Sequence, residues 1–165
     1  MNYDSDSDSD SFHEFDLSRY KSEGLISKIL DGVYLSGYTA ACSPETLKAY
    51  NIKRIISLGN EIELAQYETF SEVEYHRICI DDSNDVDIKT HFTKAVEFIK
   101  KSDDPILIHC WAGISRSVTI LAAYLISEKG MNNYEAIDFI RQRRKCICPN
   151  IGFQTQLIAF SEEFK

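Results

Sequence analysis

Short apolar runs alternate with longer amphipathic segments along most of the chain. The runs at 52–59 and 74–80 are rich in β-branched residues and end in turn residues, which predicts two strands. The run PILIHC (105–110) is apolar until its last two residues, as expected for a strand buried on both faces of a sheet. The segment KILDGVYLSG (28–37) places an Asp-Gly pair between two short apolar stretches and predicts a β-hairpin.

Other segments carry apolar residues at helical spacing and have recognisable ends. Ser43 and Pro44 are typical of a helix start, and Asp87 stands where the next helix needs an N-cap. The segment 117–130 is apolar almost all round and ends at Gly130, which predicts a buried helix with a glycine C-terminus. Because helices alternate with strands, we expect an α/β fold with a central, mostly parallel sheet flanked by helices. The predicted helices are 42–51, 87–101, 117–130, 133–145 and 152–164.

The charge is concentrated at the N-terminus. The chain has 26 acidic and 18 basic residues, and residues 1–16 hold six of the acidic ones and no Lys or Arg. The remaining 20 acidic and 18 basic residues leave the rest at a net charge of −2. The low-complexity stretch YDSDSDSDSF therefore predicts a disordered acidic tail over residues 1–24. The remaining residues, 25–165, are expected to form one folded domain that is large enough to be catalytic. The tail is either a solvated segment without a specific role or a phosphorylation target of acidophilic kinases. Neither the tail nor the domain has the net basic face of a nucleic-acid binder.

The composition also indicates in which cellular compartment the protein is expected. No run is long and apolar enough to cross a membrane, and the N-terminus lacks a secretory pattern. Five cysteines without a paired spacing favour a reduced protein, so we expect a cytoplasmic location, with the nucleus as a second compartment. Cys146 and Cys148 have no second ligand pair nearby, and we expect no metal or organic cofactor.

The loop HCWAGISRS (109–117) joins the buried strand to the apolar helix. Its small residues let several backbone N–H groups converge beside a helix N-terminus, which is an anion site. Arg116 adds a planar fork that matches two phosphate oxygens. Cys110 lies in the same positive field, which favours its nucleophilic thiolate. The pattern predicts attack of sulfur on a bound phosphoryl group. A buried structural cysteine is the alternative, and the agreement of strand, loop and helix disfavours it.

The same nine residues resemble the His-Cys-x-Ala-Gly-x-Ser-Arg-Ser signature of the small, atypical dual-specificity phosphatases in the protein tyrosine phosphatase superfamily. The similarity continues through AYLI (123–126) and RQRRKCICPNIGFQTQLIAF (141–160) and covers about residues 25 to 164. It implies the cysteine-phosphatase fold and hydrolysis of phosphotyrosine and phosphoserine or phosphothreonine through a cysteinyl-phosphate. It also implies phosphorylated proteins as partners and no cofactor.

The resemblance further implies roles for single residues. Cys110 is the nucleophile, Ser117 stabilises it as it leaves, and Asp82 is the general acid. Asp82 is favoured over Asp81 because the family places a second aspartate five residues later, here Asp87. The implied phosphate-binding loop consists of Trp111, Ala112, Gly113, Ile114, Ser115 and Arg116.

The resemblance also implies supporting roles for two residues, and at one position the sequence differs from the family pattern. His109 resembles the residue that tunes the nucleophile through loop hydrogen bonds, with a plain core histidine as the alternative. Asn150 resembles the asparagine that braces the phosphate loop, although a turn or helix cap also fits it. Trp111 is larger than the residue usually found at its position, which bears on substrate choice.

Two other functions remain as alternatives. A phosphoprotein-binding pseudophosphatase usually lacks the cysteine or the arginine, whereas Cys110, Arg116 and Asp82 are all present here. A phosphatase for a lipid or an RNA 5′ end is disfavoured by the absence of lysine from the loop and by the nearly neutral domain. The sequence makes no prediction of an oligomeric state.

Overall fold

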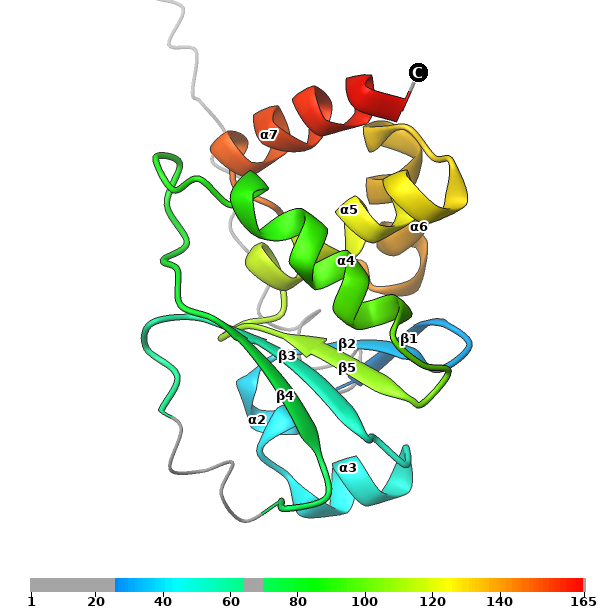
Figure 1. The fold of residues 1–165 in the computed structure, drawn as a ribbon. Helices are drawn as coiled ribbons and strands as arrows, with labels where there is room; N and C mark the ends of the chain where they lie inside the picture. Colours follow the sequence, from blue (N-terminus) through cyan, green and yellow to red (C-terminus); the bar gives the residue numbers. More distant parts are fainter. Residues whose placement is uncertain (1–25, 64–69, 165) are drawn as a thin grey trace, which may run out of the picture.

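A twisted five-stranded sheet lies between two layers of helices (Figure 1). The computed structural model describes residues 26–63 and 70–164. In this sheet β1 pairs antiparallel with β2, and all other neighbouring strands are parallel, in the order β1-β2-β5-β3-β4. The predicted α/β class with a mostly parallel sheet is therefore confirmed. The strands are β1 (Ile26–Leu30), β2 (Val33–Ser36), β3 (Arg54–Leu58), β4 (Glu74–Ile78) and β5 (Ile106–His109).

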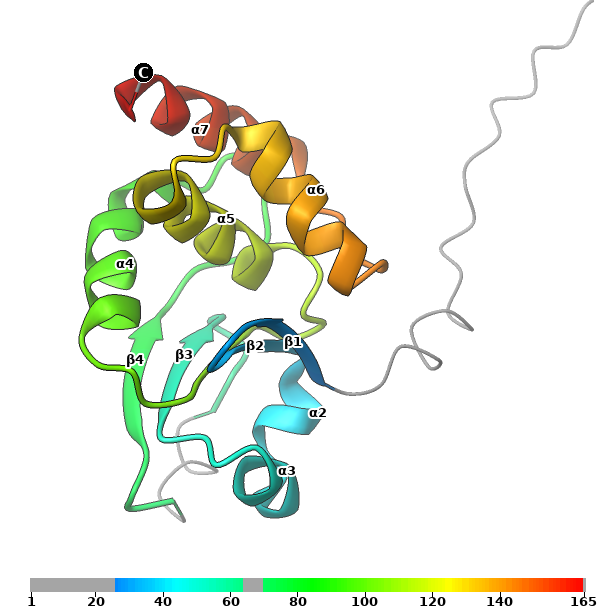
Figure 2. The ribbon, with the colours of Figure 1, turned by 90° about the vertical axis from the view of Figure 1, so that its right-hand side faces the viewer.

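The helices divide between the two faces of the sheet (Figure 2). Two short helices cover one face, and four longer ones cover the other. Among the longer ones α5 is almost wholly buried, because α4, α6 and α7 all pack against it. The short helices are α2 (Tyr38–Ala41) and α3 (Pro44–Ala49). The longer ones are α4 (Phe92–Lys100), α5 (Arg116–Lys129), α6 (Asn133–Arg143) and α7 (Ile151–Ser161), with 3₁₀ turns η2 (Lys89–His91) and η3 (Glu162–Phe164).

Strands β3 and β5 are buried on both faces of the sheet. For β5 this agrees with the prediction from the apolar run PILIHC. Ile55 and Leu107 point into a small core under α2 and α3. Ile56 and Ile108 point into the larger core under α5. Alternate residues of a strand face opposite sides, so the middle of these strands is mostly apolar on both faces. The buried Arg54 of β3 bonds to backbone carbonyls at the opposite end of the strand from the site. Polar groups of the site can gather only where the strands end.

Most of the predicted element ends are confirmed. The Asp-Gly pair joins β1 to β2, and the Ser43 side chain accepts a hydrogen bond from the Thr46 N–H at 3.1 Å as the cap of α3. Gly130 ends α5 with φ +68°, in the left-handed region that suits glycine. No helix of the described residues is long and apolar enough to span a bilayer. The acidic segment 1–24 lies outside the described residues.

The predicted N-cap role of Asp87 is wrong. The chain first forms η2 and only then α4, and Ile88 and His91 occupy the two N-cap positions without a side-chain cap. Asp87 takes part through its backbone carbonyl, which accepts a bond from Thr90 Oγ at 2.9 Å. Because the Ile88 side chain is fully buried in the core, the backbone turns tightly there before the regular helix begins.

Candidate active site

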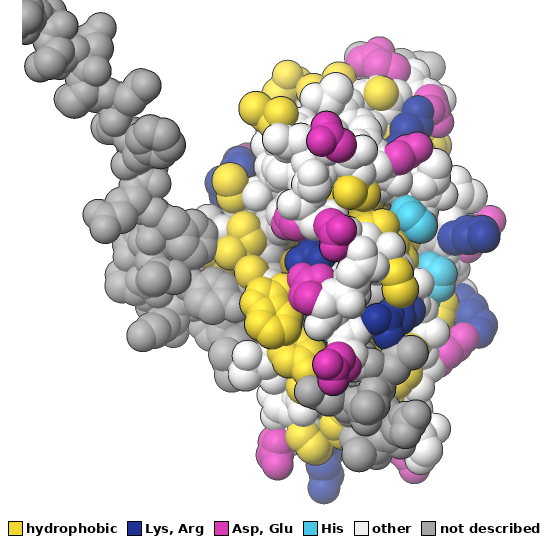
Figure 3. All heavy atoms as spheres, turned by 90° about the vertical axis from the view of Figure 1, so that its left-hand side faces the viewer, with side chains coloured by type: hydrophobic (Ala, Val, Ile, Leu, Met, Phe, Trp, Pro, Cys, Tyr) yellow, Lys and Arg dark blue, Asp and Glu magenta, His cyan; other side chains and the backbone are white. Residues whose placement is uncertain are grey.

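The site lies at the edge of the sheet where β5, β3 and β4 end. These strands are parallel neighbours, so the segments that follow them meet at one edge. The segments are the loop after β5, residues 59–63 after β3 and residues 80–88 after β4. We call 110–115 the phosphate loop and 80–88 the acid loop. Figure 3 shows a basic side chain recessed among acidic ones on this face, beside large hydrophobic side chains.

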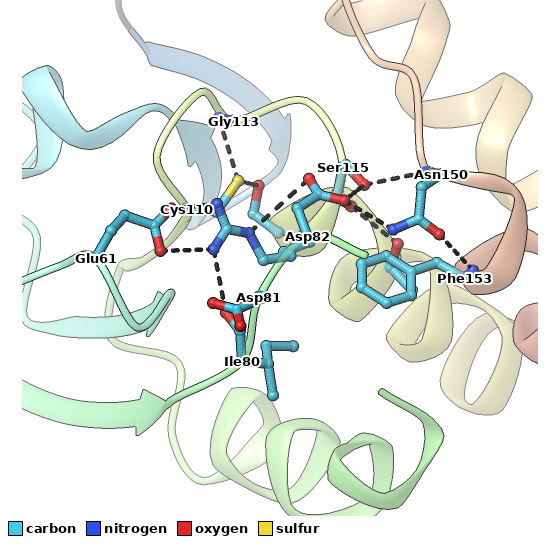
Figure 4. A network of polar contacts seen from close by, with 12 residues as sticks. Glu61, Ile80, Asp81, Asp82, Cys110, Gly113, Ser115, Asn150 and Phe153 are labelled. Atoms are coloured by element: carbon cyan, nitrogen blue, oxygen red, sulfur yellow. Dashed lines mark hydrogen bonds and ion pairs between the residues drawn. The ribbon is translucent and has the colours of Figure 1, made fainter. Parts of the chain in front are cut away.

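The Cys110 sulfur lies at the bottom of the phosphate loop, and the residue is 1% exposed. It accepts a hydrogen bond from the Gly113 N–H at 3.2 Å and lies 3.3 Å from Ser117 Oγ (Figure 4). Gly113 has φ +69°, and a Cβ there would overlap the Ser36 backbone carbonyl. The loop can therefore curl tightly around the sulfur only with glycine at this position.

Arg144 holds the other side of the same glycine. It is 2% exposed, and its Nε donates to the Gly113 carbonyl at 2.9 Å while Nη1 donates to Ser27 Oγ at 3.0 Å. With its N–H bound to Cys110 and its carbonyl bound to Arg144, Gly113 is fixed on both sides. Arg144 belongs to the segment that carries the family resemblance, but the sequence alone assigned it no place in the site.

Arg116 is the first residue of α5 and is 5% exposed. Its Nη1 donates to Glu61 Oε2 at 2.8 Å and to the Ile80 carbonyl at 3.1 Å, and Nη2 also donates to Glu61. Burial by itself lowers the pKa of Arg116, but the hydrogen bond to Glu61 and nearby negative groups outweigh it and raise that pKa. The bond from Arg116 in turn lowers the pKa of Glu61. The two side chains therefore form a charged pair with one fixed geometry.

The Nε atom of Arg116 differs from its other nitrogens. It is buried and has no hydrogen-bond partner among the described residues. Its nearest carboxylate oxygen is Asp82 Oδ2, at 3.9 Å. A buried N–H without a hydrogen-bond partner lowers stability, so an acceptor bound at this edge of the guanidinium would be favourable. An anion bound between Arg116, Cys110 and Asp82 would supply one.

Asp82 is held by one of its two oxygens. Oδ1 accepts from Ser115 Oγ at 2.9 Å and from Asn150 Nδ2 at 2.7 Å, while Oδ2 lies on the side of Arg116. Asp81 instead accepts a bond from Asn60 Nδ2 at the exposed surface. The structure thus brings Asp82, the favoured of the two aspartates, to the buried arginine.

Asn150 combines the two roles that the sequence left open. Its side chain caps α7 by accepting from the Phe153 N–H at 2.9 Å, and its amide also binds Asp82. Its backbone N–H donates to Ser115 Oγ at 3.1 Å. The asparagine therefore links the phosphate loop, the acid loop and the start of α7.

Further bonds hold the acid loop to α7. The Gly152 N–H donates to Asn84 Oδ1 at 3.2 Å, and Gln156 Nε2 donates to the Val86 carbonyl at 2.8 Å. Gln156 Oε1 accepts from the Lys89 N–H at 2.9 Å, just beyond the loop. A Cβ at Gly152 would overlap the Asn84 backbone. The position of Asp82 thus depends on a helix that lies far away in the sequence.

The remaining predicted residues surround this centre. His109 is fully buried, its Nδ1 lies 3.2 Å from the Cys110 carbonyl, and burial lowers its pKa to about 4. Ala112 and Ile114 are half-buried, and the Ile114 carbonyl accepts from the Cys148 N–H at 2.9 Å. Trp111 is 53% exposed and stacks on Tyr38. His109 is therefore neutral near pH 7, and the phosphate loop is anchored on both flanks.

Glu61 is, after Arg144, a second site residue that sequence reasoning missed. It lies three residues after β3, and β3 pairs directly with the strand that precedes Cys110. A signal was available, because polar residues just past the ends of neighbouring parallel strands gather at one edge. The stretch LGNEIEL offers two glutamates, however, and the sequence alone does not say which of them faces the arginine.

The groups at the site are arranged for an anion. The polar contacts of the Cys110 sulfur among the described residues are an N–H and a hydroxyl, and the Arg116 guanidinium interacts with it electrostatically. Over the described ranges, no group of three or more His, Cys, Asp or Glu side chains is placed to hold a metal ion. Arg116, the backbone N–H groups of the phosphate loop and the N-terminus of α5 contribute positive potential at the site.

Comparison with known proteins agrees with this geometry. A family model described as "Dual specificity phosphatase, catalytic domain" matches residues 33–163. Dual specificity protein phosphatase 1 of Arabidopsis thaliana is 33% identical over 141 residues, which are 84% of this chain and 70% of that protein. The chain spans only 34% and 35% of the length of two other curated relatives that it matches.

Solved structures show the same similarity. The crystal structure of DUSP15 matches with a TM-score of 0.78 and 32% identity, over 84% of this chain and 88% of that one. The human tyrosine phosphatase-like serine/threonine/tyrosine-interacting protein matches with a TM-score of 0.77 and 29% identity, over 84% and 97%.

Proposed function

Since the chain belongs to the dual specificity phosphatase family, we propose that it hydrolyses phosphotyrosine and phosphoserine or phosphothreonine in proteins. The observation that carries the proposal is the buried Nε of Arg116, which has no partner among the described residues and lies beside the Cys110 loop. An acceptor between these groups completes the site, and a phosphoryl oxygen has the right charge and shape. Phosphorylated proteins in the cytoplasm or nucleus are the proposed partners.

The first chemical step uses three side chains. The Cys110 thiolate attacks phosphorus while Arg116 binds two phosphoryl oxygens, a sulfur–phosphorus bond forms and the bond to the leaving oxygen breaks. Asp82 gives its proton to that oxygen, so the serine, threonine or tyrosine leaves as a neutral hydroxyl. Oδ2 is the oxygen suited to carry this proton, because Oδ1 already accepts two bonds.

The second step releases phosphate. Asp82, now a carboxylate, takes a proton from a water molecule whose oxygen attacks phosphorus. The sulfur–phosphorus bond breaks and its electron pair returns to Cys110 as a thiolate. The Gly113 N–H and the Ser117 hydroxyl, at 3.2 and 3.3 Å, are placed to stabilise that negative charge. The enzyme ends with a thiolate and the product as inorganic phosphate.

The test is phosphate release from one peptide that bears both phosphothreonine and phosphotyrosine, with mass spectrometry to locate the lost group. We expect loss from both positions, abolished in Cys110→Ser. Cys79→Ser is the matched control, because Cys79 is an exposed cysteine outside the phosphate loop.

Other outcomes separate the alternatives. Loss from tyrosine alone would narrow the activity to a tyrosine phosphatase. No loss from either position, in folded and reduced protein, would contradict the proposal. Binding of the intact phosphopeptide would then favour a binding protein, and release from a lipid or a 5′-phosphorylated RNA would favour a non-protein substrate.

A further inference from the structure

Two aromatic side chains form a flat surface next to the nucleophile. Trp111 directly follows Cys110, and its ring stacks on Tyr38 with ring centroids 5.0 Å apart and an interplanar angle of 16°. The Tyr38 N–H donates to the Trp111 carbonyl at 2.9 Å, so backbone and rings are held together. We call Trp111 and Tyr38 the aromatic platform.

The platform is exposed and already ordered. Trp111 is 53% exposed although one face of its ring is covered by Tyr38. The other large exposed hydrophobic side chains of the described residues lie elsewhere, at the C-cap of α3 and on α6, α7 and η3. The exposed ring needs no rearrangement to bind an apolar group, and such preorganisation favours binding because little conformational entropy is lost.

The charges around the site are the second part of the argument. Glu61, Asp81 and Asp82 are acidic and at least partly exposed, whereas Arg116 is buried beneath them. On one face of the molecule, Figure 3 shows acidic side chains around a recessed basic one, with hydrophobic side chains to one side. Acidic residues beside the phosphorylated residue of a substrate would be repelled there. An uncharged aromatic residue meets no such repulsion.

We propose that the aromatic platform is a binding subsite for an aromatic side chain next to the phosphorylated residue of a protein substrate. The inference rests on the proposed function, since Cys110 and Arg116 then fix the position of the phosphate. The phosphorylated side chain spans the distance from the substrate backbone to Cys110, and the half-exposed Trp111 ring projects from the residue next to Cys110. Adjacent residues of an extended substrate lie about 3.8 Å apart, so a large side chain beside the phosphorylated residue has the length to turn back onto that ring. Stacked aromatic pairs add affinity beyond the area that they bury.

The experiment uses four phosphotyrosine peptides that differ only in the residue next to phosphotyrosine, which is Phe, Ala, Glu or Lys. We measure kcat/KM for each with the wild type, Trp111→Ala and Trp111→Phe. The readout is the ratio of kcat/KM between peptides within one variant, because any change in the chemical step cancels in that ratio. We expect the wild type to favour Phe over Ala by about 5- to 10-fold and Ala over Glu by a further few-fold. Trp111→Ala should reduce the Phe-to-Ala ratio to about 1, and Trp111→Phe should retain most of it.

An equal rate for the Phe and Ala peptides in the wild type would overturn the proposal, and so would a preference that survives in Trp111→Ala. A Lys peptide favoured over the Phe peptide would assign the platform to a cation instead and would also overturn it. If no peptide is hydrolysed, the proposed function fails, and titration of the same peptides into Cys110→Ser still tests the platform. Tighter binding of the Phe peptide would then support the platform, and equal binding would reject it.

Discussion

At the scale of single residues, the two edges of the Arg116 guanidinium have different surroundings. Glu61 binds both terminal nitrogens of Arg116, whereas Nε has no partner among the described residues. The carboxylate therefore holds the arginine and leaves one edge open. Because the phosphate fork works only in one orientation, Glu61 acts as a positioning residue.

We predict that Glu61→Ala lowers kcat/KM by about 10-fold, because a misplaced fork binds the transition state less well. Glu61→Gln keeps one acceptor and should lie between Ala and the wild type. Steady-state kinetics on an aryl phosphate measure both. Rates at or above the wild-type level in both variants would show that Glu61 competes with phosphate instead.

His109 couples stability to pH. Burial lowers its pKa to about 4, against about 6.5 in the unfolded chain. Between these values the unfolded state binds the proton and the folded state does not, so stability is full above about pH 6.5 and falls as the pH falls. We predict that this residue alone costs about 2 kcal/mol of unfolding free energy between pH 7 and pH 5.

Urea unfolding at both pH values tests this, with His109→Gln as the comparison. The variant should lose about 2 kcal/mol less than the wild type over the same interval. An identical pH dependence in the two proteins would contradict the prediction.

The sequence could predict Cys110 and Arg116 because a nine-residue loop contains both. It could not predict the contacts of Arg144 or Glu61, because each joins the site across a distance set by the fold. Arg144 reaches Gly113 from the end of α6, and Glu61 reaches Arg116 across 55 positions. The local pattern around either residue is typical of an ordinary charged surface.

At the scale of elements, the pairing of the acid loop with α7 decides where Asp82 lies. Gly152 is the closest approach, since a Cβ there would overlap the Asn84 backbone. Its N–H also donates to the Asn84 side chain. The loop is therefore a fixed part of the site, held by a helix from the far end of the described chain.

We predict that Gly152→Ala slows hydrolysis of substrates with poor leaving groups, such as phosphothreonine, by about 10-fold or more, because Asp82 moves and protonation suffers. Alanine otherwise favours a helix by about 1 kcal/mol over glycine, so a loss points to the contact with the loop. An aryl phosphate with a good leaving group should be affected much less.

Thr155→Ala is the control for this comparison, because among the described residues its hydroxyl bonds within α7, to the Ile151 carbonyl. Equal slowing of both substrates by Gly152→Ala would mean that the acid loop had kept its place.

Elements were predicted best where their signal was local. The Asp-Gly turn, the Ser43 cap and Gly130 each act within a few residues, and the structure has all three. Asp87 failed as a cap because the buried Ile88 and the contacts of the acid loop decide the backbone there. Long-range packing overrode a good local cap.

At the scale of the whole molecule, the anion site joins elements that would otherwise meet only at their ends. Arg144 links the phosphate loop to the β1–β2 hairpin, Ser115 links it to the start of α7, and Arg116, directly after the loop, binds Glu61 in the segment after β3. A ligand that completes this junction should stabilise the entire fold, because it binds only the folded state.

We predict that tungstate at about 100 times its dissociation constant raises the unfolding free energy by about 2.7 kcal/mol. For a domain of this size that is about 5–10 °C in Tm. Arg116→Lys, which loses the planar fork, should lose most of the shift. Arg143→Lys is the matched control, since Arg143 is exposed on α6. Thermal melts with and without the oxyanion measure both, and an equal shift in all three proteins would exclude Arg116 as the binding group.

The bond between Gly152 and Asn84 also has a consequence during synthesis. These residues are 68 positions apart, which a ribosome covers in about 3–14 s at about 5–20 residues per second. A nascent chain that already contains Cys110 and Arg116 still lacks the helix that holds Asp82. With Asp82 as the proposed general acid, protonation of a leaving group becomes available only once α7 has been made, and we therefore expect an unfinished chain to hydrolyse phosphate esters slowly.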